Sequence, residues 1–242
     1  MKDPRDLNAF KIQRQPDDTT CGPTCLHAVY EHFGEDVPLD EILPQVPTLE
    51  GGGTLGVLLA THAVRRGYRV KLITWNIQVF DPTWFEPGAS PLREKLLARS
   101  AAKNDSKISL AAKAYVDFLD AGGKLEFRDL EPALLRKYLK RGVPILTGLS
   151  ATFLYNNARE RGHDNEADDV AGDPVGHFVV LTGYEPETRE VLVSDPMYPN
   201  PLASEHTYPV RMQRVIGAIY LGVLTYDANL IIIEPRPGTK GS

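Results

Sequence analysis

Helical patterns lead and strand patterns follow along this chain, and that order is the feature that most constrains its fold. Apolar residues recur at helical spacing over 21–33 and again over 55–66. Two apolar runs toward the carboxy terminus, 177–184 and 190–194, are joined by a turn at 185–188 and predict a β-hairpin. We therefore expect an α+β fold in which an N-terminal helical layer packs on a C-terminal antiparallel β-sheet, and we do not expect an alternating βαβ arrangement.

Shorter patterns fill most of the remaining chain. They predict helices at 39–43 and 131–140 and strands at 68–75, 124–128, 143–149 and 230–234. The segment 211–223 fits either a helix or a strand. Thr54 precedes the helical run at 55–66 and is expected to cap it with its hydroxyl.

Residues 76–125 fit neither the leading helices nor the sheet. An aromatic and proline-rich loop is followed by two helix-like runs, near 91–102 and 107–121. We interpret this part as a helical insertion within a single domain spanning residues 1–242. A chain of 242 residues is long enough to bury one sizeable core.

Charge and composition argue against several classes of partner. The net charge is −5, and no Lys/Arg cluster forms the basic stripe that nucleic-acid binding needs. No apolar run approaches the length of a membrane span, and the N-terminal residues lack the apolar core of a signal peptide, so we expect a cytoplasmic protein without membrane insertion. The two cysteines lie four positions apart, which excludes a disulfide framework and favours reduced thiols.

Cys21 stands at the start of the first helical run, followed by Gly22 and Pro23. Proline is tolerated in a first helical turn, where backbone N–H groups have no intrahelical acceptor. The same free N–H groups stabilise a negative charge, and the thiolate is the nucleophilic form of cysteine. Cys25, one turn later, is expected to pack beneath the site rather than to react.

Three other side chains complete a set that is suited to thiol catalysis. His177 opens an apolar strand after Gly176, and Asp195 ends the returning strand, where its carboxylate can accept a hydrogen bond from the ring Nδ1–H. Gln15 supplies an amide donor that can hold an oxyanion together with the Cys21 backbone N–H. No further Cys or His completes a four-ligand set, so neither a metal nor a cofactor is expected.

These motifs resemble a known family. Gln15 with Cys21-Gly22-Pro23, then Gly176-His177-Phe-Val-Val, then Asp195-Pro196, are similar to the papain-like cysteine peptidases that cleave double-glycine leaders from bacteriocin precursors, and to their stand-alone members. The resemblance covers roughly residues 10–75 and 130–235. It implies Cys21 as nucleophile, His177 as general base and acid, Asp195 as the group that orients the ring, and Gln15 as oxyanion donor.

Three functions remain open from the sequence. The first is a cysteine peptidase or amidase that hydrolyses a peptide or protein substrate through this Cys-His-Asp set. The second passes the acyl group from the same thioester to an amine, as an acyl transferase or transpeptidase. The third is a non-catalytic peptide-binding module of the same fold. The acidic segment 156–174 is a candidate gate over the cleft, or a feature that favours cationic peptides.

Overall fold

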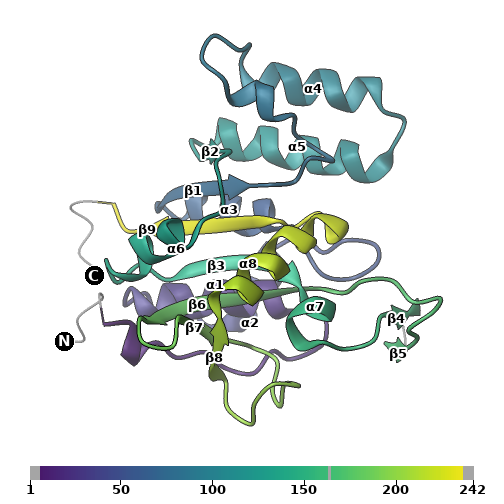
Figure 1. Ribbon diagram of the computed structural model, residues 1–242. Helices are drawn as coiled ribbons and strands as arrows, with labels where there is room; N and C mark the ends of the chain where they lie inside the picture. The colour runs from purple at the N-terminus through teal and green to yellow at the C-terminus, as the bar shows by residue number, and fades with distance from the viewer. Residues whose placement is uncertain (1–5, 163–164, 237–242) are drawn as a thin grey trace.

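The computed structural model describes residues 6–162 and 165–236, and its centre is a mixed β-sheet (Figure 1). Within these residues the sheet has seven strands in the order β2-β1-β9-β3-β6-β7-β8. Every neighbouring pair is antiparallel except β1 with β2, which are parallel. The strands are β1 Arg69–Thr74, β2 Lys124–Glu126, β3 Ile145–Ser150, β6 Gly176–Glu185, β7 Glu190–Ser194, β8 Thr207–Arg211 and β9 Asn229–Glu234.

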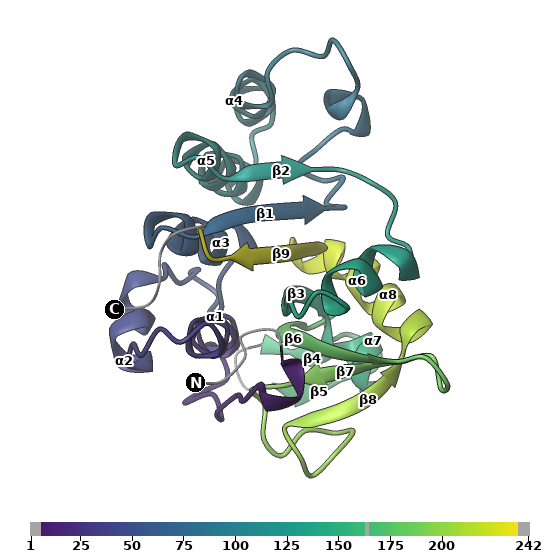
Figure 2. The ribbon, with the colours of Figure 1, turned by 90° about the vertical axis from the view of Figure 1, so that its left-hand side faces the viewer.

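Helices cover both faces of the sheet, so the sheet separates two hydrophobic cores (Figure 2). One face carries α1 (Cys21–His32) and α3 (Gly56–Arg65), and the other carries α6 (Pro132–Leu139), α7 (Ala151–Tyr155) and α8 (Met212–Leu221). In β6, Val180 faces the first core, while Val179 and Leu181 face the second. Burial on both faces explains the continuous apolar runs of β3 and β6, because neither strand presents a face to water.

The α+β prediction is confirmed, and the sheet is more extensive than the sequence indicated. The predicted helical layer is present as α1, α2 (Leu39–Ile42) and α3, but a second helical layer lies on the opposite face. Strands β1 and β2, from the first half of the chain, extend the sheet beyond its C-terminal strands. The ambiguous segment 211–223 contains the helix α8.

The predicted insertion contains two helices that lie at the β2–β1 edge of the sheet (Figure 1). These are α4 (Leu92–Ala102) and α5 (Ser106–Asp120), which pack on each other, while α5 also packs on α3. Asp105 starts α5, because its carboxylate accepts hydrogen bonds from the backbone N–H groups of Lys107 and Ile108. Phe118 of α5 is fully buried in the core shared with α1 and α3.

One capping prediction is wrong. The Thr54 hydroxyl donates to the carbonyl of Pro47 rather than capping α3. The first N–H of that helix, at Gly56, is instead taken by the carboxylate of Asp227, which comes from the far end of the chain. A tertiary contact therefore replaces the local cap.

Some small elements also lie outside the predicted set. Besides α7 and β8, a two-stranded sheet forms from β4 (Glu160–Arg161) and β5 (Glu166–Ala167) within the acidic segment. Residues 163–164 of that segment lie outside the described residues. Among the described residues, 3-10 helices lie at Leu7–Ala9, Leu43–Gln45, Pro82–Phe85 and Gly222–Thr225.

Burial of Phe118 gives a stability test of the insertion. We expect Phe118→Ala to lower the free energy of unfolding by about 3–5 kcal/mol, because it removes a buried ring and leaves a cavity. The matched control is Leu110→Ala on the exposed face of the same helix, where the side chain is 49% exposed. Chemical denaturation followed by circular dichroism measures both. Equal, small effects of the two substitutions would contradict the shared core.

Candidate functional site

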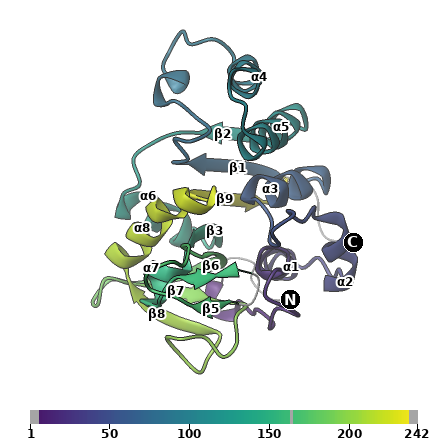
Figure 3. The same cartoon turned by 90° about the vertical axis from the view of Figure 1, so that its right-hand side faces the viewer.

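Cys21 is the first residue of α1, a helix that packs against β6 (Figure 3). As the first helical residue, its backbone N–H has no intrahelical acceptor. Gly22 allows the close approach, because a Cβ there would lie 2.9 Å from Thr54 Cγ2 and 3.2 Å from the ring of Phe178. Cys21 is therefore held between the first turn of α1 and the start of β6, an interior strand of the sheet.

His177 and Asp195 are brought together by the β6–β7 hairpin. Val180 pairs with Ser194 in the hairpin register, which sets His177 and Asp195 at the same end of it. The ring Nε2–H of His177 donates to Asp195 Oδ1 over 2.8 Å, and both side chains are buried. The prediction that Nδ1 of the ring donates to Asp195 is wrong. Since Nε2 is used by Asp195, Nδ1 is the nitrogen left to meet the thiol.

Charges in this group determine the protonation of His177. Burial acts to lower the pKa of the ring, but the charge of Asp195, the charge of Cys21 and hydrogen bonds with both side chains outweigh it and raise the pKa to about 10. A ring with a raised pKa carries a positive charge at neutral pH. An imidazolium beside a cysteine sulfur is the kind of surrounding that stabilises a thiolate.

Asp195 is held by two tyrosines that the sequence analysis did not identify. Tyr155, at the end of α7, and Tyr208, in β8, each donate a hydroxyl hydrogen bond of 2.6 Å to Asp195 Oδ2. Oδ1 accepts from His177 and, over 2.9 Å, from the backbone N–H of Met197. The carboxylate thus has four donors without any exposure to solvent.

These donors keep a buried carboxylate charged. Burial by itself raises the pKa of Asp195, but the charge of His177 and the hydrogen bonds from the ring and the two tyrosines lower it below the ordinary value. Burial and the nearby carboxylate raise the pKa of both tyrosine hydroxyls, so the tyrosines remain neutral donors. The only signal for Tyr208 in the sequence is its place in an alternating run at 207–211, and Tyr155 carries none.

The backbone of Asp195 is fixed as well. Its N–H donates to the carbonyl of His206 over 2.8 Å, and His206 Nδ1–H donates back to the carbonyl of Asp195 over 2.8 Å. The ring of His206 stacks on Tyr198, with 4.7 Å between the centroids. The position of the carboxylate therefore depends on main-chain and side-chain contacts together.

Gln15 lies beside this group, and its side chain is buried. Its backbone N–H donates to the carbonyl of Pro196 over 2.9 Å, which ties the segment before α1 to the turn after β7. One side-chain amide hydrogen goes to the carbonyl of Asp17 over 2.8 Å. The amide Nε2 has a second hydrogen, while Oε1 is buried without a hydrogen-bond partner among the described residues.

Cys25 differs from Cys21 in its surroundings. It is fully buried, and its thiol donates to the carbonyl of Phe178 over 3.3 Å. Burial, together with the charges of Cys21 and Asp195, raises the pKa of the Cys25 thiol well above its usual range. Cys25 is therefore a packing residue beneath Cys21.

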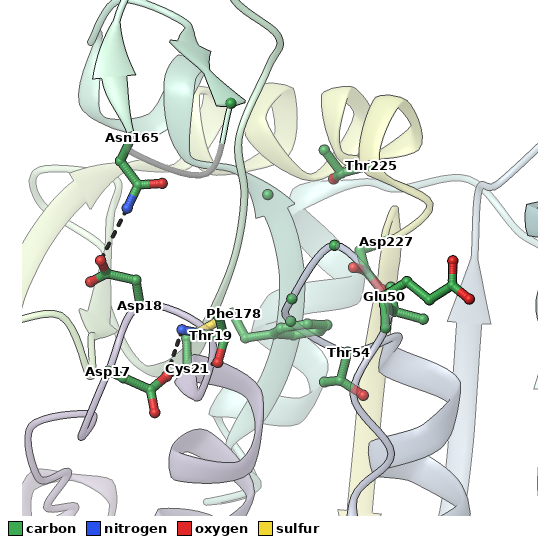
Figure 4. Close-up of a pocket in the computed structure, with 16 residues that line it drawn as sticks. Asp17, Asp18, Thr19, Cys21, Glu50, Thr54, Asn165, Phe178, Thr225 and Asp227 are labelled. Atoms are coloured by element: carbon green, nitrogen blue, oxygen red, sulfur yellow. Dashed lines mark hydrogen bonds between the residues drawn. The ribbon is translucent and has the colours of Figure 1, made fainter.

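A pocket of about 600 Å³ opens beside Cys21 (Figure 4). Its walls come from the loop before α1, the glycine-rich loop 49–54, the start of β6 and the turn before β9. The acidic segment reaches the pocket through Asn165, whose amide donates to Asp18 Oδ2 over 3.0 Å. The residues that line this pocket include none from the insertion at 76–125.

Nowhere in 6–162 and 165–236 do three or more His, Cys, Asp or Glu side chains gather in a way that could hold a metal ion. The helices in that part of the chain are too short or too polar to cross a bilayer.

Solved structures with a similar arrangement are peptidases of low sequence identity. The peptidase domain of Streptococcus ComA, a bifunctional ABC transporter involved in a quorum-sensing pathway, is 14% identical, with 94% of this chain and 99% of that chain covered and a TM-score of 0.43. A double-glycine motif protease from an AMS/PCAT transporter, in complex with its leader peptide, is 12% identical over 93% of this chain and 91% of that chain, with a TM-score of 0.43. Xylellain, a cysteine protease from Xylella fastidiosa, is 16% identical over 96% and 85%, again with a TM-score of 0.43.

Comparison with curated protein sequences gives no significant match. The Peptidase_C39 like family matches residues 100–221, half of the chain. That stretch contains His177, Asp195 and both tyrosines, whereas Gln15 and Cys21 precede it. The chain belongs to the Peptidase_C39 like family.

Proposed function

We propose that this protein is a cysteine peptidase or amidase that cleaves a peptide bond through Cys21, His177 and Asp195. The observation that carries this proposal is the buried, hydrogen-bonded His177–Asp195 pair, coupled to a thiol at a helix N-terminus. Membership of the Peptidase_C39 like family supports the same class of reaction. The substrate is a peptide or protein.

In the first step, the Cys21 thiolate attacks the carbonyl carbon of the substrate and forms a tetrahedral intermediate with a negatively charged oxygen. The C–N bond then breaks, and His177 gives its Nδ1 proton to the leaving amine. The products of this step are a free amine and a thioester on Cys21. Asp195 keeps the ring of His177 oriented, and the negative charge of Asp195 favours the protonated ring before the substrate binds.

In the second step, water resolves the thioester. His177 is now neutral and takes a proton from the attacking water, and the second tetrahedral intermediate collapses with loss of the Cys21 sulfur. The released acid and the restored thiolate–imidazolium pair complete the cycle. An amine in place of the water gives the transferase reaction instead, so the product identifies the acceptor.

Gln15 is proposed as a donor to the oxyanion. Its Nε2 keeps one hydrogen beyond the bond to Asp17, and the Cys21 backbone N–H is free of the helix. Two donors aimed at the developing charge each contribute on the order of 3 kcal/mol to the transition state.

Replacing Cys21 tests the nucleophile. We expect Cys21→Ala to fold like the wild type and to lose both iodoacetamide labelling near neutral pH and peptide turnover, because the sulfur is the attacking atom. Intact-mass spectrometry after incubation with peptides measures the acyl-enzyme directly, and product analysis separates hydrolysis from aminolysis. Cys25→Ala is the control and should retain labelling. Persistent rapid labelling of Cys21→Ala would refute the assignment, and peptide binding without any adduct in the wild type would favour a non-catalytic module.

Removing the Gln15 amide tests the oxyanion role. We expect Gln15→Ala to lower kcat about 100-fold with little change in KM, because the amide acts on the transition state more than on bound substrate. Steady-state kinetics with one peptide measures both parameters. A loss confined to KM or to thermal stability would mean that Gln15 only holds the loop before α1.

The two tyrosines are positioning residues, and their test uses pH. Above its ordinary pKa, Asp195 contributes stability that is lost as the pH falls through its lowered folded-state pKa. Tyr155→Phe and Tyr208→Phe each remove a donor, so the folded pKa should rise toward the ordinary value and acid unfolding should begin at a higher pH. Each change should cost about 1–3 kcal/mol of stability at neutral pH, since a bond to a charged group is lost.

The acid limb of the pH–rate profile should move in the same direction in both tyrosine variants, because catalysis needs the ionised carboxylate. Tyr184→Phe is a control on the same strand as His177, where the ring faces Arg136 instead. It should leave both pH curves unchanged. If the tyrosine variants lose stability but neither the acid-unfolding curve nor the pH–rate profile shifts, the tyrosines only pack in the core.

A further inference from the structure

Asp227 is a buried carboxyl that the proposed mechanism does not use. It lies in the turn before β9, is 6% exposed, and lines the same pocket as Cys21. Gly148 of β3 leaves room for it, because a Cβ there would lie 2.6 Å from the Cβ of Asp227. Its Oδ1 accepts from the backbone N–H of Gly56 over 2.8 Å and, more weakly, from the Asn229 amide over 3.5 Å.

The second carboxylate oxygen of Asp227 has no such partner. Both hydrogen bonds to this side chain end on Oδ1, and the described residues supply no donor to Oδ2. In Figure 4 the carboxylate projects from the wall opposite Asp18 and Asn165 into the space between them. Asp227 lines the pocket, so a ligand or water there can donate to an oxygen that receives no donor from the protein.

The rest of the lining offers acceptors and negative charge. Asp17, Asp18 and Glu50 also line the pocket, and among its described lining residues none is a lysine, an arginine or a histidine. The polar hydrogens of the neighbouring side chains are used inside the protein: Thr54 donates to Pro47, Thr225 donates to Gly222, and Asn165 donates to Asp18.

The pocket floor is apolar. The ring of Phe178 lies across it between Cys21 and Asp227 (Figure 4). An apolar floor below an acidic wall suits a side chain with a hydrocarbon stem and a charged head, as lysine and arginine have. Multiple donors on an ammonium or guanidinium group match the unused acceptors.

We propose that this pocket is a specificity subsite for a lysine or arginine side chain of the peptide substrate, with the Asp227 carboxylate binding the cationic head. This proposal rests on the proposed function, because that function supplies the peptide substrate. Asp227 is the residue that selects the substrate side chain. The bond to the cation forms at Oδ2, while Oδ1 keeps its bond to Gly56. The carboxylates of Asp17, Asp18 and Glu50 attract the cation to the entrance.

A purely structural role for Asp227 is the competing explanation. The bond to Gly56 places the carboxylate at the N-terminus of α3, which alone accounts for Oδ1. Burial raises the pKa of Asp227 to about 7, so the protein keeps a carboxyl here that is costly to ionise. A bound cation offsets that cost, whereas a cap made by asparagine would avoid it.

The first experiment measures charge selectivity at Cys21 without requiring turnover. Methanethiosulfonate reagents carrying a trimethylammonium, an uncharged alkyl or a sulfonate group are reacted with the protein at about pH 8, where carboxyls with a pKa near 7 are ionised. The rate of Cys21 modification by the cationic reagent is divided by the rate with the neutral reagent, and this ratio is divided by the same ratio for free cysteine. The result reports the electrostatic potential at Cys21. Peptide mapping assigns the modification to Cys21.

We expect a normalised ratio of about 10 in the wild type and a drop of about 5-fold in Asp227→Asn, which keeps an acceptor for Gly56 but loses the charge. Glu187→Gln, an exposed acid outside the pocket, is the matched control and should behave as the wild type. A wild-type ratio near 1, or an unchanged ratio in Asp227→Asn, would overturn the subsite while leaving the peptidase proposal in place.

If Cys21 reacts with none of the reagents, that result counts against the proposed peptidase function but not against the subsite. A binding experiment then tests the subsite by itself. Calorimetry then compares arginine amide with citrulline amide, which has nearly the same shape without the charge, on Cys21→Ala and on Cys21→Ala/Asp227→Asn. Tighter binding of arginine amide only where Asp227 is present supports the subsite. Equal binding of the two ligands, or a preference that survives the loss of Asp227, refutes it.

Discussion

The architecture around the site depends on keeping one carboxylate charged inside the protein. An isolated carboxylate is too costly to bury, and Asp195 remains ionised because four donors surround it. Those donors come from α7, β6, β8 and the turn after β7, so the charge ties together segments that are distant in the chain. The orientation of His177 follows from this arrangement.

The elements that periodicity specifies could be predicted from the sequence. The helices α1 and α5 and the β6–β7 hairpin lie where the patterns predicted them, because each buries a continuous apolar face. Strand β8 was not predicted, because Pro209 interrupts its strand pattern. Proline is tolerated there because β8 is at the edge of the sheet. Helix α7 has only five residues and shows no periodicity of its own.

The candidate site was predictable only in its most characteristic residue types. Cys21, His177, Asp195 and Gln15 stand next to glycines, prolines or strand ends, and such positions can be recognised locally. The two tyrosines and Asp227 act through contacts with residues far along the chain, so no local sequence pattern predicts their roles. The same limit explains the wrong cap, because the competition between Thr54 and Asp227 is settled by tertiary packing.

Cys21 begins the first long helix of the chain, whereas His177 and both tyrosine-bearing elements come in its second half. During synthesis, the thiol leaves the ribosome well before its imidazole partner, and α1 has no β6 to pack against until that strand is made. A thiol without the base is a weak nucleophile at neutral pH. The wide separation of the two residues therefore means that the proposed Cys21–His177 pair can form only after β6 has been synthesised.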